Sequence, residues 1–211
     1  MYSEIDWSEF WNDTNSRNDK NAKLMKMYQD IIKEVKMIKI MFVCLGNICR
    51  SPMAEFILKD MVDKKGLSQE FYIRSSATSY EEIGNDMHYE AKDKLLQKGI
   101  LFFKRKAVRL TLEDYKKYDY IIGMEESNIR NIKRIVGEDT EHKVYRLLDF
   151  SKNPHDIADP WYTGNFEIAY NDIVEGCTGF LKFLKIWDIN FRYEYGGICC
   201  LNKFYYGGNH E

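Results

Sequence analysis

The fold is decided by residues 40–52, which read Ile40-Met41-Phe42-Val43-Cys44-Leu45-Gly46-Asn47-Ile48-Cys49-Arg50-Ser51-Pro52. The first four residues are apolar, and a short apolar run that ends in turn residues predicts a buried strand. Ser51 followed by Pro52 predicts the start of a helix, because proline is favoured at the first helical position. The stretch therefore predicts a strand, a short loop and a helix in direct succession.

Strand and helix patterns continue to alternate along the chain. Apolar runs predict strands at 71–73, 120–124 and 144–148. Helical spacing predicts helices at about 87–98, at 129–136 and at about 165–188, and a capping box at 111–114 predicts the start of another short helix. Such alternation predicts an α/β fold, with a parallel sheet covered by helices on both faces. The functional site of such a sheet lies at the carboxyl ends of its strands. Cys44 and the polar runs at 74–79 and 149–160 are expected at that edge.

The flanking segments differ from this alternating region. Residues 1–20 are polar and rich in Asn and Asp, and apolar residues at helical spacing follow at about 21–36. The last residues, 196–211, have no clear periodicity. We predict a domain at 38–190, preceded by a partly disordered extension at 1–37 with a short amphipathic helix, and followed by a tail at 191–211.

Composition excludes several classes of function. The chain has 211 residues, with 31 Lys and Arg against 33 Asp and Glu, so its formal net charge is -2. This balance predicts no binding to nucleic acid or to an anionic membrane, and no apolar run approaches a membrane span. The first six residues lack an apolar signal core, and five cysteines, an odd number, disfavour a disulfide framework. We therefore expect a cytoplasmic protein, and no pattern predicts its oligomeric state.

Residues 44–51 have the composition of an anion-binding loop that begins with a nucleophile. Backbone N–H groups in such a tight turn, together with a helix N-terminus, bind anions, and the guanidinium of Arg50 matches two oxygens of a phosphoryl group. The same positive field favours the thiolate of Cys44, to which Ser51 can donate a hydrogen bond, and Gly46 lets the backbone turn. The alternative is a buried cysteine at a strand end with Arg50 as a solvated helix residue.

A carboxylic acid near this loop would protonate a leaving group. Asp159 is one candidate, because Pro160 restricts its backbone, and Trp161 and Tyr162 offer aromatic walls for a flat substrate. Asp149 and Asp156 are competitors, and a plain surface Asp-Pro turn is the alternative interpretation. The four histidines, His88, His142, His155 and His210, are dispersed, so we expect no metal site and no other cofactor.

Residues 43–52 closely resemble the signature loop of low-molecular-weight protein tyrosine phosphatases. The resemblance covers roughly 38–188 and includes Ser75-Ser76-Ala77-Thr78-Ser79, Ile83-Gly84-Asn85, Asp119-Tyr120-Ile121-Ile122, Met124-Glu125-Glu126-Ser127-Asn128 and Asp159-Pro160-Trp161-Tyr162. It implies a flavodoxin-like α/β fold with a central four-stranded parallel sheet and helices on both faces. It also implies hydrolysis of phosphate monoesters without a metal.

The resemblance further implies roles for individual residues. Cys44 would be the nucleophile that forms a phosphocysteine, Arg50 the phosphate clamp, and Asp159 the general acid and then the base for water. The loop that binds phosphate would comprise Leu45, Gly46, Asn47, Ile48, Cys49 and Ser51, with Asn47, Ser51 and Ser75 in the polar network that holds its shape. The implied substrates are phosphotyrosine-containing proteins and small aryl phosphates, with acid phosphatase activity. Ile48 favours phosphotyrosine over phosphoarginine, because relatives that prefer phosphoarginine tend to have a smaller polar residue there.

Two features lie at the margins of the family pattern. The family usually has a histidine in the segment after Gly99, and here Arg105 replaces it, which puts part of the supporting network in doubt. Cys49 lies close to Cys44 in the loop, and the resemblance suggests a reversible disulfide that shields Cys44 from over-oxidation. The alternative is that Cys49 only packs inward. Cys177 is expected in the core, and Cys199 and Cys200 have no assigned role.

Two other functions compete with a phosphatase. A thiol-based arsenate reductase has the same fold and loop but needs additional cysteines, and Cys199 and Cys200 are adjacent and far along the chain. A catalytically weak phosphate-binding module would not need the complete set of Cys44, Arg50 and Asp159. The sequence therefore favours the phosphatase.

Overall fold

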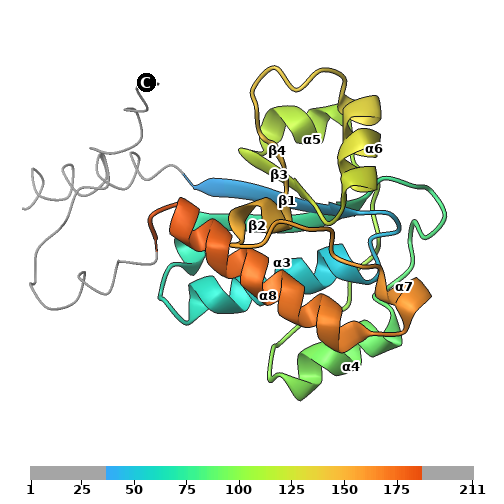
Figure 1. The fold of residues 1–211 in the computed structure, drawn as a ribbon, viewed down its shortest axis with the longest axis vertical. Coiled ribbons are helices and arrows are strands. Elements are labelled where there is room, and N and C mark those ends of the chain that lie inside the picture. The colour runs from blue at the N-terminus through green and yellow to red at the C-terminus, as the bar shows by residue number, and fades with distance from the viewer. Residues whose placement is uncertain (1–36, 187–211) are drawn as a thin grey trace, which may run out of the picture. The chain divides into compact units, whose positions relative to one another are not determined.

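The computed structural model describes residues 37–186, which form an α/β fold around a parallel sheet (Figure 1). The four strands are β1 (Ile38–Cys44), β2 (Phe71–Ala77), β3 (Tyr120–Gly123) and β4 (Val144–Arg146). Their order in the sheet is β2-β1-β3-β4, and all three pairings are parallel. The predicted α/β architecture with a four-stranded parallel sheet is confirmed.

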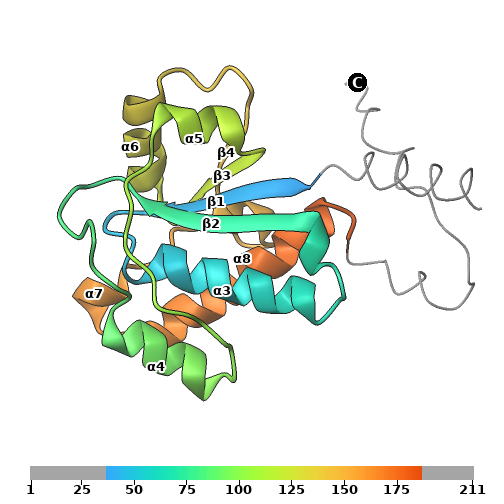
Figure 2. The ribbon, with the colours of Figure 1, turned by 180° about the vertical axis from the view of Figure 1, so that it is seen from behind.

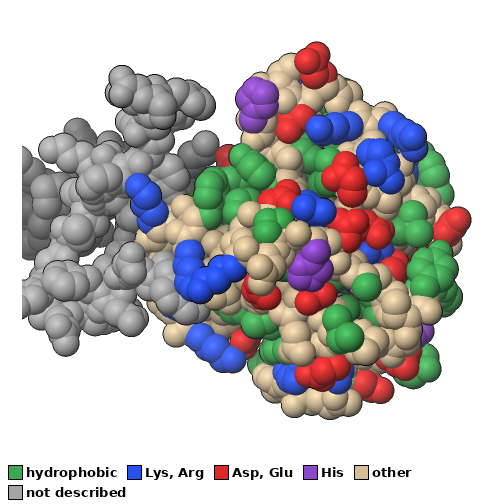
Figure 3. Space-filling model, viewed as in Figure 1, with side chains coloured by type: hydrophobic (Ala, Val, Ile, Leu, Met, Phe, Trp, Pro, Cys, Tyr) green, Lys and Arg blue, Asp and Glu red, His purple; other side chains and the backbone are tan. Residues whose placement is uncertain are grey.

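Helices cover both faces of this sheet (Figures 1 and 2). One face carries α3 (Arg50–Asp63), α4 (Tyr89–Gln97) and α8 (Phe166–Phe183), and the other carries α5 (Leu112–Lys117) and α6 (Glu126–Val136). The short elements are α7 (Pro160–Thr163) and two 3-10 helices, η1 (Ser68–Glu70) and η2 (Leu147–Phe150). On the face seen in Figure 3, basic side chains stand among acidic ones, in keeping with the nearly balanced charge.

Alternation along β1 divides the core into two parts. Ile40 and Phe42 point into the larger cluster, which includes side chains of α3 and α8, whereas Met41 and Val43 point into the smaller cluster with residues of α5 and α6. Successive side chains of a strand face opposite sides of a sheet, so a strand buried on both faces is apolar at every position. The run at 40–43 is apolar for this reason, and it places Cys44 at the carboxyl edge.

Two predicted strand boundaries are wrong. β2 does not end at Ile73 but continues through the polar residues to Ala77, because it stays paired with β1 up to Cys44. Conversely, β4 ends at Arg146, and Leu147 and Leu148 belong to η2, where they are buried against the larger cluster. Leu147 and Leu148 are apolar because they are buried and not because they pair in the sheet, whereas Ser75 and Ser76 are polar although they are both buried and paired.

Within residues 37–186 the predicted helices form, with shifted ends. The capping box at Thr111 and Asp114 is present at the start of α5, and Gly66, Gly99 and Gly137 have positive φ after the helices that they follow. The last helix ends at Phe183 rather than at 188, and α7 was not predicted from the sequence. The predicted helix at 21–36 and the tail at 191–211 lie outside the described residues, and the proposed domain boundaries stay predictions.

The described part of the chain has no helix that is both long and apolar enough to cross a membrane.

Packing of α8 on η2 leaves no room for a side chain at Gly179. A Cβ atom there would collide with the backbone carbonyl of Phe150. Alanine in place of glycine normally stabilises a helix by about 1 kcal/mol. We predict the opposite sign here: Gly179→Ala lowers the free energy of unfolding by roughly 1–3 kcal/mol, because an overpacked contact shifts the backbone.

Urea denaturation of the full chain measures this change. Glu175→Ala, at an exposed position of the same helix, is the control and is expected to shift stability by less than about 0.5 kcal/mol. An unchanged or raised midpoint for Gly179→Ala would contradict the close packing.

Candidate active site

Cys44 lies at the carboxyl end of β1, where the chain turns into the loop before α3. The thiol is buried, with 3% of the residue exposed. Asn47 donates its backbone N–H to Cys44 Sγ at 3.3 Å, and a hydrogen bond of 3.0 Å joins Cys44 Sγ to Ser51 Oγ. Ser51 Oγ accepts from Asn47 Nδ2 at 2.9 Å, and its own proton can go to the sulfur or to the backbone carbonyl of Ser76, which lies 3.4 Å away. Donors of this kind stabilise a thiolate.

The loop is held in an uncommon backbone conformation. Asn47 has a φ of 59°, in the left-handed region, and its side chain is fully buried. Asparagine tolerates this region better than most residues. Gly46 does not have a positive φ, and a Cβ atom there would lie 3.0 Å from Glu82 Cγ, so a larger residue would push this side chain aside. The backbone conformation of the loop is therefore least common at Asn47.

Arg50, the first residue of α3, is 1% exposed and is surrounded by acceptors. Its Nη1 donates to the carbonyl of Ile157 at 2.8 Å, and its Nη2 donates to Glu125 Oε1 at 3.0 Å and to the carboxylate of Asp159. Burial opposes the charge, but the negative charges of Cys44, Asp159 and Glu125 raise the pKa of Arg50 above its ordinary value. Arg50 Nε is buried and has no hydrogen-bond partner among the described residues, so one donor remains for an anion.

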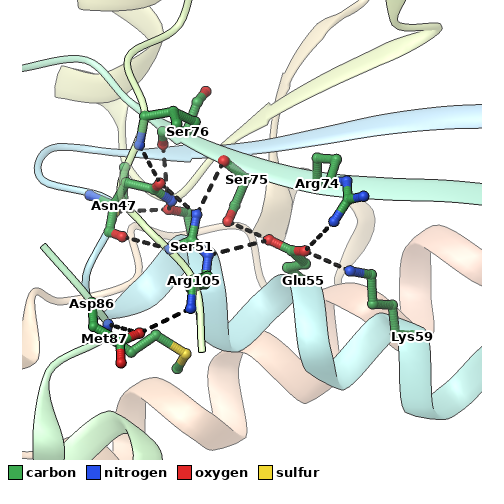
Figure 4. Close-up of polar contacts among 12 residues, drawn as sticks. Asn47, Ser51, Glu55, Lys59, Arg74, Ser75, Ser76, Asp86, Met87 and Arg105 are labelled. Carbon is green, nitrogen blue, oxygen red and sulfur yellow. Dashed lines mark hydrogen bonds and ion pairs between the residues drawn. The ribbon is translucent and has the colours of Figure 1, made fainter. Parts of the chain in front are cut away.

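Arg105 supports the loop of residues 45–49 through hydrogen bonds to Asn47 (Figure 4). Its Nη1 donates to the backbone carbonyl of Asn47 at 2.9 Å, and its Nη2 donates to Asn47 Oδ1 at 2.6 Å. Glu55 lies on the far side, with Oε2 3.9 Å from Arg105 Nε, and accepts a hydrogen bond of 2.6 Å from Ser75 Oγ. The segment that departs from the family pattern thus still holds the loop, through an arginine and its buried counter-charge.

Of the three candidate aspartates, only Asp159 lines the same cavity as Cys44 and Arg50. It caps α7, where its Oδ1 accepts the backbone N–H of Trp161 at 3.1 Å. Asp149 and Asp156 instead bind Arg146, each at 2.8 Å. The structure therefore separates the competitors that the sequence left open.

The cavity over the loop has a volume of about 160 Å³. Its lining comprises Cys44, Leu45, Gly46, Ile48, Cys49, Arg50, Glu81, Glu82, Asp159, Trp161 and Tyr162. Trp161 and Tyr162, which the sequence predicts as aromatic walls, line the cavity and are 54% and 76% exposed. Asn47, Ser51 and Ser75 hydrogen-bond around the loop and do not line the cavity. A buried thiol, a guanidinium and a carboxyl group therefore meet in one small space.

Sequence reasoning missed several residues of this site. Glu125 binds both Arg50 and Asn128 Nδ2, yet it stands in a polar turn with no local sign of that role. Its position directly after β3, at the carboxyl edge, is the signal that topology offered. Glu55 has no such signal, because a glutamate on a helix is usually solvated, whereas here only 2% is exposed. The cavity residues Glu81 and Glu82 were also missed.

The cysteines of the described residues, Cys44, Cys49 and Cys177, are all free and buried. Cys177 lies in the core on α8, as expected. Burial, followed by the negative charge of Cys44, raises the pKa of the Cys49 thiol well above its ordinary value. Cys49 thus stays a thiol at neutral pH, and its redox role stays a prediction. Residues 37–186 contain no cluster of three or more His, Cys, Asp or Glu side chains that would hold a metal ion.

Comparison with known proteins identifies relatives over the described region. The family model for low molecular weight phosphotyrosine protein phosphatase matches residues 39–187. The chain is 40% identical over 151 residues to the low molecular weight protein-tyrosine-phosphatase YfkJ of Bacillus subtilis, covering 71% of this chain and 97% of that protein. The crystal structure of YfkJ is similar with a TM-score of 0.69 and 38% identity, over 71% of this chain and 96% of that one.

Two further solved structures are similar. The low molecular weight protein tyrosine phosphatase SP-PTP of Streptococcus pyogenes has a TM-score of 0.66 and 35% identity, over 75% of this chain and all of that chain. The Drosophila arginine phosphatase DARP has a TM-score of 0.65 and 31% identity, over 70% of this chain and 98% of that chain.

The contacts of Arg105 predict how the loop responds to its removal. In Arg105→Gln, two hydrogen bonds to Asn47 are lost, each contributing about 0.5–1.5 kcal/mol. We expect binding of inorganic phosphate to weaken roughly tenfold, measured by isothermal titration calorimetry. Lys104→Gln removes an equal charge from the neighbouring exposed residue and is expected to bind like the unmodified protein. Equal affinities for all three proteins would show that Arg105 does not shape the loop.

Proposed function

The chain belongs to the low molecular weight phosphotyrosine protein phosphatase family, and we propose that it hydrolyses phosphotyrosine and small aryl phosphates through a phosphocysteine on Cys44. The observation that carries this proposal is the cavity in which Cys44, Arg50 and Asp159 meet. The family supports the reaction type, and the three side chains supply a nucleophile, an anion clamp and a proton donor. Apart from the substrate and one water molecule, the proposed steps use only groups of the chain.

In the first step the thiolate of Cys44 attacks phosphorus. A P–S bond forms, the bond from phosphorus to the aryl oxygen breaks, and Asp159 gives its proton to that oxygen. Arg50 and the backbone N–H groups of the loop hold the phosphoryl oxygens, where negative charge is concentrated in the transition state. The backbone N–H of Asn47 donates to Cys44 Sγ, and Ser51 Oγ shares a hydrogen bond with it, so both groups hold the sulfur in place for the attack.

In the second step water releases the phosphoryl group. Asp159, now ionised, takes a proton from the water as its oxygen attacks phosphorus, the P–S bond breaks, and Cys44 leaves as a thiolate. Inorganic phosphate is the product, and Asp159 is protonated again. The two steps restore the starting state with one water consumed.

The contact between Arg50 and Asp159 belongs to the state without substrate. The oxygens of a phosphoryl group and the carboxylate of Asp159 are all acceptors for the guanidinium of Arg50. A bound phosphoryl group would compete for Arg50 and free the carboxyl group to turn toward the leaving oxygen. Because the first step needs Asp159 protonated, we also propose acid phosphatase activity that increases as pH falls toward the acidic range.

The other functions find less support. Arsenate reduction needs further cysteines near the site, whereas Cys177 is fully buried in the core, and Cys199 and Cys200 lie outside the described residues. Phosphoarginine remains a substrate to assay, because DARP is an arginine phosphatase, although Ile48 in the cavity favours an aryl group. Arsenate reduction and phosphoarginine hydrolysis, each assayed beside aryl phosphate hydrolysis, would distinguish the three.

Replacement of the sulfur tests the nucleophile. Cys44→Ser keeps the size of the side chain but offers a hydroxyl that stays protonated, so we expect hydrolysis of p-nitrophenyl phosphate to fall by roughly a thousandfold or more. Binding of inorganic phosphate should persist, because Arg50 and the loop are intact. Turnover that remains near the original rate would rule out a phosphocysteine.

Replacement of Asp159 tests the acid. Asp159→Asn should slow hydrolysis of phenyl phosphate by about 10²–10⁴-fold, and that of p-nitrophenyl phosphate less, because a better leaving group needs less protonation. The alkaline limb of the pH–rate profile that reports this acid should disappear. Asp156→Asn, in the same loop but bound to Arg146, is the matched control and should retain the original profile. Equal slowing of both substrates would assign the proton to another group.

A further inference from the structure

Two glutamates line the cavity without any part in the proposed chemistry. Glu81 and Glu82 stand in the loop that follows β2 and share the cavity with Cys44 and Arg50. Neither was a candidate from the sequence. Their carboxylates add negative charge to a cavity whose proposed substrate is itself an anion, so they call for an explanation.

Glu82 lies beside the loop of residues 45–49. Its Cγ would lie only 3.0 Å from a Cβ atom at Gly46, and its Oε2 accepts a hydrogen bond of 2.7 Å from Asn85 Nδ2. The negative charge of Glu82 also contributes to the raised pKa of Cys49, after larger effects from burial, Cys44 and Asp159. Glu82 therefore closes one wall of the cavity above the loop.

Glu81 is the more exposed of the two. Its backbone N–H is bound to Ser79 Oγ at 3.4 Å, and among residues 37–186 its carboxylate has no ion-pair or hydrogen-bond partner. Since no cation of the described residues neutralises it, its charge acts on whatever enters the cavity. A carboxylate that is exposed and unpaired at the mouth of a cavity is well placed to meet a charged group of a ligand.

The floor of the cavity carries a positive charge, in contrast to the negative charge of Glu81 at its mouth. Arg50 is almost fully buried there, and its Nε has no partner among the described residues, so the floor is built to receive an anion. The start of α3 directs further backbone N–H groups to the same place. The cavity thus has a cationic floor for the phosphate and an acidic rim for what surrounds it.

We propose that this chain prefers phosphotyrosine peptides in which Lys or Arg lies next to the phosphotyrosine, and that Glu81 is the residue that recognises the cation. The inference rests on the proposed function, because it concerns substrates of that same site. The phosphoryl group binds at Arg50, the ring lies between the exposed aromatic walls, and a neighbouring cationic side chain meets Glu81 at the rim. Acidic neighbours are repelled by the same charge.

Exposed ion pairs are weak, which sets the size of the expected effect. A flanking cation should improve binding by roughly two- to fivefold per pair. Screening reduces such an effect, and the preference should shrink when the ionic strength rises from about 0.05 M to about 0.5 M. A larger effect that salt does not change would point to shape rather than charge.

The test uses three phosphotyrosine peptides that differ only in two flanking residues, which are Lys, Ala or Glu. Dissociation constants are measured for the full chain carrying Cys44→Ser, so that the comparison does not depend on turnover. We expect the tightest binding for the Lys peptide and the weakest for the Glu peptide. Glu81→Gln in the same background should reduce the ratio of the two constants, and Glu81→Lys should reverse it.

Glu138→Gln is the matched control, because it removes an exposed carboxylate beyond the far end of α6. It should leave the ratio as it is in the Cys44→Ser chain. Equal affinities for the three peptides, or a ratio that Glu81→Gln does not change, would overturn the inference. Turnover of aryl phosphate by the unmodified chain is a separate readout, so failure of the proposed function is distinguishable from failure of this preference.

Discussion

The site depends on one constraint: a sulfur and a guanidinium must both be buried within a single short turn between a strand and a helix. Cys44 ends β1 and Arg50 begins α3, so five loop residues separate them. Buried polar groups are costly unless they are paired. The sulfur is paired inside the loop, but Arg50 takes its acceptors from Glu125, Ile157 and Asp159, on the segments that follow β3 and β4. The loop therefore needs the whole carboxyl edge of the sheet.

The acceptors of Arg50 also shape the chemistry. Two carboxylates pair with Nη2 of its guanidinium, so part of the positive charge is already compensated before an anion arrives. A phosphoryl group must then be held by what remains, which is Arg50 Nε, the backbone N–H groups of the loop and the N-terminus of α3. Displacement of Asp159 recovers a further donor at the moment when its carboxyl group is needed elsewhere. In the proposed mechanism, binding and proton transfer are thereby linked through the side chain of Asp159.

Local pattern predicted the fold well, because β1 and the helices carry clear periodicity and end signals. Prediction from local pattern failed where contacts between distant segments determine the structure. Ser75 and Ser76 are polar but stay in β2, since the strand is paired with β1 and Ser75 binds the buried Glu55. Arg105 and Glu125 bind across 58 and 75 residues of sequence, and no local pattern reports such partners. A nucleophilic role for Cys44 could be proposed from the sequence because the groups that contact its sulfur belong to one contiguous loop.

The division between floor and rim has a structural origin. The floor comes from the turn between β1 and α3, whereas the acidic rim comes from the loop after β2, and the two meet where Glu82 lies over Gly46. Residues of the floor are bound to one another and to buried partners, so a change there disturbs the whole site. Glu81 is exposed and has no such ties within the described residues, so its charge can change without moving Cys44 or Arg50. If Glu81 acts as proposed, a change of this residue would alter substrate preference and leave the proposed reaction intact.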